Sequence, residues 1–63
     1  MLKQFIEMIK ENGYNVEITR FSDSGIIEVS KDGNKRGNFM AYDFTDEDCM
    51  RVIEKTITEM QKI

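Results

Sequence analysis

The spacing of apolar residues changes twice along this chain, from a helical period to a period of two and back. Near the start, apolar residues recur every three or four positions, which predicts an amphipathic helix; they are Leu2, Phe5, Ile6 and Ile9. Three segments, 14–21, 26–31 and about 35–44, are predicted as strands. A second helical stripe then follows, formed by Cys49, Val52, Ile53, Thr56, Ile57 and Met60.

Short turn motifs separate these elements. Gly13 stands where a helix commonly ends in a left-handed residue. Residues 22–25, Ser-Asp-Ser-Gly, are typical of a turn. Asp32-Gly33 is a strong hairpin signal because both residues tolerate a positive φ. Gly37 indicates a bulge in the third strand.

Each predicted helix has one apolar stripe and each strand one apolar face, so both helices should pack on the same side of an antiparallel meander. The chain is therefore predicted to be a single α+β domain, 1–63, of order α-β-β-β-α. The expected inner face comprises Phe5, Ile6, Ile9, Val16, Ile18, Ile27, Val29, Val52, Ile53 and Ile57. The register of the third strand stays open, since either Phe39 and Ala41 or Met40 and Tyr42 could point inward.

The other face of the sheet is expected to meet solvent, with Glu17, Thr19, Phe21, Ile26, Glu28 and Ser30 on it. Either register of the third strand adds an apolar or aromatic pair beside Phe21 and Ile26. A contiguous apolar group of this kind is a candidate contact patch.

The chain has 63 residues, one cysteine and no histidine. These counts exclude an intramolecular disulfide and the usual zinc motifs, so stability must come from packing or from oligomerisation, and a homodimer stays open. A single thiol fits a cytoplasmic setting, and no stretch has the length of a signal peptide or a membrane span.

Nucleophilic triads most often use a histidine base, and the chain has no histidine. Catalysis is therefore not expected. Cys49 begins the apolar stripe of the second helix and is interpreted as a buried, inert side chain. The acidic residues do not follow the spacing of a calcium loop. We therefore predict no enzyme activity, no cofactor and no metal site.

Four carboxylates occur within six residues, at Asp43, Asp46, Glu47 and Asp48. Thr45 followed by Asp48 fits a capping box, and acids in a first turn complement the helix dipole. One or two acids would suffice for these purposes. The dense anionic run therefore indicates a surface that meets a basic partner.

The order of elements is also that of double-stranded RNA-binding domains, which place lysines at the start of their last helix. Here that position is acidic, the net charge is −3 and the pI is near 4.8. Direct nucleic-acid binding is therefore not expected. Lys31, Lys35 and Arg36 form a local exception around the hairpin. A basic β-hairpin can enter a major groove, but the favoured interpretation is a solvated turn with edge-strand charges that discourage aggregation.

The chain also resembles small phage-encoded anti-CRISPR proteins that inhibit a type II effector nuclease. The similarity runs through residues 6–19, the Asp32-Gly33-Asn34 hairpin, and Val52-Ile53-Glu54-Lys55 with Ile57. It implies duplex mimicry, in which an acidic protein occupies the basic PAM-reading surface and a hairpin reaches toward a nuclease site. Two features depart from the family: Lys35 and Arg36 are basic, and no counterpart of its further acidic C-terminal helix is present.

The predicted function is that of an acidic inhibitor that binds a bacterial CRISPR effector in the host cytoplasm and blocks DNA engagement. Its predicted contact residues are Asp32, Gly33, Asn34, Asp43, Asp46, Glu47, Asp48, Phe21 and Ile26. The alternative is a non-catalytic regulatory or protein-interaction domain, either monomeric or dimeric, that uses its open sheet face or basic hairpin. Neither hypothesis involves a membrane.

Overall fold

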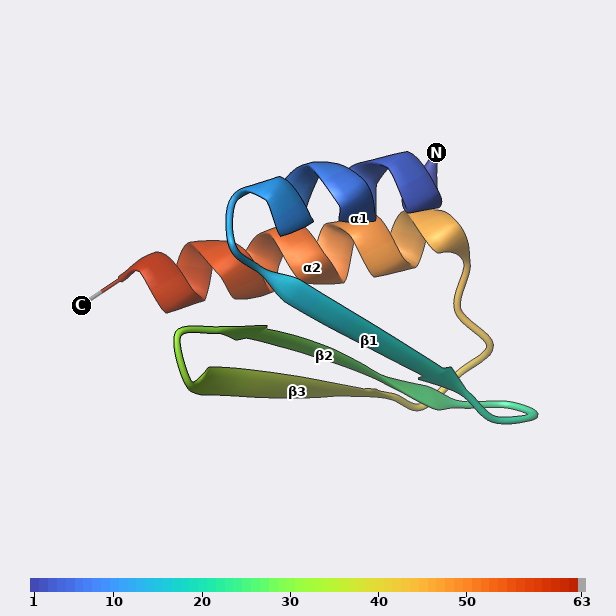
Figure 1. The fold of residues 1–63 in the computed structure, drawn as a ribbon. Coiled ribbons are helices and arrows are strands. Elements are labelled where there is room, and N and C mark those ends of the chain that lie inside the picture. The colour runs from blue at the N-terminus through green and yellow to red at the C-terminus, as the bar shows by residue number, and fades with distance from the viewer. Residues whose placement is uncertain (63) are drawn as a thin grey trace.

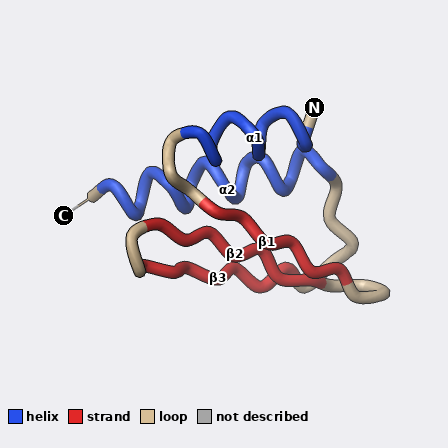
Figure 2. The backbone as a smooth tube through the Cα atoms, in the orientation of Figure 1, coloured by secondary structure: helices blue, strands red, loops and turns tan. Residues whose placement is uncertain are grey.

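The computed structural model describes residues 1–62, and its element order confirms the predicted α+β class (Figure 1). The elements are α1 (Leu2–Glu11), β1 (Asn15–Arg20), β2 (Gly25–Lys31), β3 (Asn34–Met40) and α2 (Asp46–Gln61). The strands form one antiparallel sheet in the order β1-β2-β3. Both helices cover the same face of that sheet, α1 against β1 and α2 against β2, and the opposite face is open (Figure 2).

The turn that joins α1 to β1 is a Schellman motif. Gly13 has φ +93°, and its N–H donates to the Lys10 carbonyl. The Tyr14 N–H donates to the Ile9 carbonyl, which completes the pair of bonds that defines this cap. Tyr14 and Ile9 are both buried, so the cap also fixes where the first strand leaves the helix.

The β2–β3 hairpin is a two-residue turn, as the Asp32-Gly33 pair predicts. Both residues have positive φ, 52° and 84°, which suits the right-handed twist of the flanking strands. Gly37 was expected to mark a bulge, and this prediction was wrong. The register of β2 and β3 runs without interruption past Glu28↔Gly37.

The register also determines which face each side chain occupies. Met40 points toward the helices and is buried, whereas Phe39 lies on the open face and is 69% exposed. Opposite residues on that face form rows, of which Thr19, Ile26 and Phe39 make one. The next row places Glu17 directly opposite Glu28.

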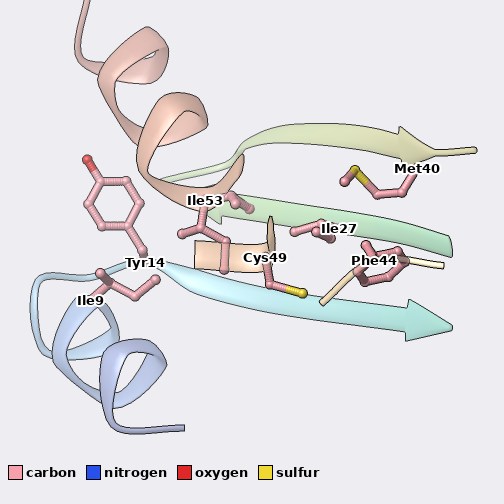
Figure 3. Packing of buried hydrophobic residues seen from close by; sticks show 8 residues of the cluster. Ile9, Tyr14, Ile27, Met40, Phe44, Cys49 and Ile53 are labelled. Carbon is pink, nitrogen blue, oxygen red and sulfur yellow. The ribbon is translucent and has the colours of Figure 1, made fainter. Parts of the chain in front are cut away.

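A hydrophobic cluster lies between the sheet and the helices (Figure 3). Its buried members are Ile9, Tyr14, Ile27, Val29, Met40, Phe44, Cys49 and Ile53. The remaining predicted inner-face residues pack against this cluster while keeping partial exposure; they are Phe5, Ile6, Val16, Ile18, Val52 and Ile57. The predicted inner face is therefore confirmed.

The predicted end of the third strand and the predicted start of the second strand were wrong. The third strand ends at Met40, and Phe44 is a buried residue of the loop before α2. Gly25 is the buried first residue of β2 and not part of the turn. A Cβ on Gly25 would lie 2.5 Å from the Phe44 ring and 2.5 Å from the Thr19 carbonyl oxygen, so the glycine makes room for that ring.

One polar bridge connects β3 to α2. Asn38 faces the helices, and its Nδ2 donates to Thr56 Oγ1 at 2.9 Å. The Thr56 hydroxyl in turn donates to the Val52 carbonyl at 2.8 Å, which satisfies this buried group. Thr56 therefore belongs to the inner stripe of α2 with its hydrogen bonds made.

Candidate partner-binding surfaces

The N-terminus of α2 carries the predicted capping box. The Thr45 hydroxyl accepts the Asp48 N–H at 3.1 Å, and Asp48 Oδ2 accepts the Thr45 N–H at 2.9 Å. Asp48 also pairs with Arg51, one helical turn on. The hydrogen bond from the Thr45 N–H is the main cause of a lowered pKa for the Asp48 carboxyl, and the Arg51 guanidinium adds to it. Asp48 is therefore occupied by helix capping.

This lowered pKa predicts an acid-sensitive helix start. Because the Asp48 pKa is lower in the folded state, its stabilising contribution is present above the unfolded pKa of about 4 and is lost as pH falls through the folded pKa. The parent should lose thermal stability below about pH 4. In the Asp48→Asn variant this acid-induced decrease should be smaller, because the variant has no carboxylate to protonate at this position. Melting curves by circular dichroism at several pH values measure this. Asp43→Asn is the matched control, and equal acid profiles for both variants would contradict the prediction.

Arg20 is the residue that sequence reasoning missed at this surface. Its Nη1 donates to the Phe44 carbonyl at 2.6 Å, and its Nη2 lies 3.2 Å from Asp46 Oδ1. The guanidinium carbon also stands 4.3 Å from the centre of the Phe44 ring. Arg20 therefore ties the end of β1 to the loop before α2. A signal was present in the sequence, because Arg20 continues the inward-facing positions 16 and 18.

Asp43, Asp46, Glu47 and Asp48, here called the acidic end, are thus not equivalent. Four carboxylates with Arg20 and Arg51 beside them leave a local charge of −4 + 2 = −2. Asp46 keeps 66% of its side chain exposed despite its ion pair. Among residues 1–62, Asp43 and Glu47 make no ion pair and are exposed, so they are the carboxylates freest to meet a partner.

Asp32, Gly33 and Asn34 lie at the opposite end of the molecule, beside the C-terminal turn of α2 (Figure 1). The longest dimension of the molecule is 33 Å. The structure therefore does not bring the hairpin and the acidic end together in one compact site. A partner that contacts both must extend along the molecule.

Phe21 lies in the turn after β1, and Ile26 is the second residue of β2; Arg20, which precedes Phe21, pairs with Asp46 of the acidic end. Phe21 was expected on the open face of β1; it follows the last residue of β1 and belongs to the turn, where its N–H donates to the Ser24 carbonyl. Ile26 lies on the open face between Thr19 and Phe39. Phe21 and Tyr42 are 55% and 51% exposed, so several aromatic rings meet solvent near this end of the sheet.

Cys49 is fully buried, and burial raises the pKa of its thiol. The predicted placement of this side chain in the core is confirmed. Within residues 1–62, no three side chains of metal-binding type are grouped to hold an ion. Neither of the two helices in this part of the chain combines the length and apolarity needed to cross a membrane.

Comparison of the chain with protein-family models, with curated proteins and with solved structures gives no match.

Proposed function

We propose that this protein is a non-catalytic inhibitor that binds the basic nucleic-acid-binding surface of a CRISPR effector in the bacterial cytoplasm and prevents DNA engagement. The acidic end is the principal contact in this proposal. The resemblance to anti-CRISPR proteins names the class of partner, and the charge distribution supports it.

The observation that carries the proposal is the display of exposed carboxylates by a helix start and the loop before it. Asp43, Asp46 and Glu47 are exposed together over a short stretch of chain. Effectors of this class read the PAM with arginines and hold nucleic acid in a positively charged channel. Carboxylates can replace phosphates in such a channel, and opposite charge speeds the encounter. The neighbouring exposed rings of Phe21 and Tyr42 supply the aromatic contacts common at protein interfaces.

The test is charge reversal at the two carboxylates of the acidic end that make no ion pair and no side-chain hydrogen bond among residues 1–62. The double variant Asp43→Lys/Glu47→Lys is expected to weaken inhibition at least tenfold while the protein remains folded. Loss of the Glu47 charge from the first turn of α2 should lower stability by about 0.3–1 kcal/mol. Asp46 and Asp48 are left intact, because their replacement would also remove the Arg20 pair and the capping box. The measurement is DNA cleavage by guide-loaded effectors, with the protein added before or after target DNA.

The matched control is Glu7→Lys/Glu11→Lys, which makes the same change in net charge on the exposed side of α1. Mimicry requires inhibition chiefly when the protein is added before the DNA, and it requires the control to inhibit like the parent. Absence of inhibition for every effector tried, or equal inhibition by the acidic-end variant, would refute the proposal.

The open sheet face favours a second candidate, a protein-interaction domain that binds through Ile26 and Phe39. These side chains lie opposite each other in the register, and Phe39 is largely exposed. Binding through an apolar face should persist at high salt, whereas binding through the acidic end should weaken steeply. Replacement of Phe39 by serine would abolish the first kind of binding and leave the second.

A further inference from the structure

The charge of this protein is divided between its two ends. Two adjoining hollows of about 270 Å³ and 280 Å³ lie where the β2–β3 hairpin meets the end of α2. They share Asn34 and Met60. Among residues 1–62, the charged lining residues are Lys31, Lys35, Arg36 and Lys62 against Asp32, a local charge of +4 − 1 = +3. We call these five residues with Asn34 and Gln61 the hairpin end.

From this arrangement we infer that the hairpin end binds the phosphodiester backbone of a nucleic acid. The four cations come from β2, from β3 and from the residue that follows α2. Protection of an edge strand requires charges on that strand only. Cations from three parts of the chain border these hollows, with Arg36 opposite the buried Val29 and Lys35 opposite Ser30 on the other face of the hairpin. This arrangement suits contacts to phosphate groups, and Asn34 and Gln61 add amide donors there.

The ion pairs found among residues 1–62 do not involve these cations, so no carboxylate in that part of the chain pairs with Lys31, Lys35, Arg36 or Lys62. The C-terminus of α2 contributes a partial negative charge of roughly one half, which is small against +3. The cations therefore keep a local excess of positive charge.

The turn and one lysine are held in place before any ligand arrives. The Lys31 ammonium stands 4.6 Å from the centre of the Tyr14 ring, and its side chain passes close to Gly13. Asp32 and Gly33 hold the tight turn that sets Lys31 opposite Asn34. Such preorganisation lowers the entropy lost on binding.

The net charge of −3 argued against nucleic-acid binding, but it averages over the whole chain. The molecule is 33 Å long, whereas the Debye length at 0.1 M ionic strength is about 10 Å. The acidic end is therefore screened from a phosphate held at the hairpin end, and the two ends act separately.

The experiment measures fluorescence anisotropy of a labelled 20-nucleotide single-stranded RNA, with a 20-base-pair DNA duplex as a second arm. We expect saturable binding at about 0.1 M ionic strength, where the acidic end is screened, with Kd of about 10⁻⁴ M or tighter. The log–log slope of affinity against salt should approach roughly −3 for four contacts with single strands. Comparison of the two affinities shows whether the protein binds single-stranded RNA or duplex DNA more tightly. Binding in either arm supports the inference.

The test variant is Lys35→Glu/Arg36→Glu, which is expected to weaken binding at least tenfold and to reduce the salt slope by about half. Lys3→Glu/Lys55→Glu changes the net charge equally at sites away from the hairpin end and should bind nearly as the parent does. Circular dichroism confirms that both variants fold. The inference is overturned if neither nucleic acid binds at about 0.1 M ionic strength, or if the two variants lose binding equally. This assay contains no effector, so its result is independent of the inhibition proposed for the acidic end.

Discussion

The Ile53→Ala variant is expected to lose about 2–5 kcal/mol of unfolding free energy. Ile53 is fully buried at the centre of the cluster between α2 and the sheet. Its truncation removes apolar contacts and leaves a cavity that a small, close-packed core cannot fill. A single core of this size supplies only about 3–5 kcal/mol, so a large part of the population should be unfolded at room temperature.

Urea unfolding followed by circular dichroism measures this loss. Ile26→Ala is the matched control, because it removes the same atoms from the open face of the sheet. The control should lose less than half as much stability as Ile53→Ala. If the Ile53 variant melted within a few degrees of the parent, the packing of α2 on the sheet would have to be revised.

Gly25→Ala is expected to cost about 2–3 kcal/mol, at the upper part of the usual range for overpacking. The added methyl group would meet both the Phe44 ring and the Thr19 carbonyl oxygen at 2.5 Å. Phe44 is buried and its carbonyl accepts from Arg20, so the ring cannot withdraw without disturbing the loop before α2. The strand or the loop must therefore shift.

Gly37→Ala is the control for this prediction. Gly37 also lies in a strand, but a Cβ there would meet only the Glu28 Cγ, at 3.9 Å. That substitution should be neutral or stabilising by about 0.5–1 kcal/mol, because alanine loses less backbone entropy than glycine. Equal losses for the two alanine variants would show that the packing of Phe44 does not set the requirement at Gly25.

Local signals predicted most of this fold. The apolar periods of the two helices, the Gly13 cap, the Asp32-Gly33 hairpin and the Thr45–Asp48 capping box each depend on residues close in the chain. Such interactions can be inferred from spacing alone. The inner face followed from the same periods, because each helix and strand has a single apolar side.

Contacts between distant residues could not be predicted in this way. The roles of Gly25 and Arg20 depend on Phe44, which lies about twenty residues further along the chain. The register that turns Met40 inward follows from the two-residue length of the hairpin turn, which places Met40 opposite Gly25.

The candidate sites show the same limit. The acidic run was evident as charge, but its division between helix capping, ion pairing and free carboxylates depends on three-dimensional placement. The separation of that run from the hairpin also became evident only in the folded chain. Charge counts along a sequence cannot distinguish one mixed surface from two opposite ends.

The order in which the core residues occur has a consequence for folding kinetics. Every strand pairs with its neighbour in sequence, so the meander can form by short loop closures. Phe44, Cys49 and Ile53, however, all follow the sheet and cover its inner face only when α2 docks. The earlier elements would leave Ile27 and Val29 without that cover. Folding should therefore be a single cooperative step that waits for synthesis of α2, with no stable intermediate made of α1 and the sheet.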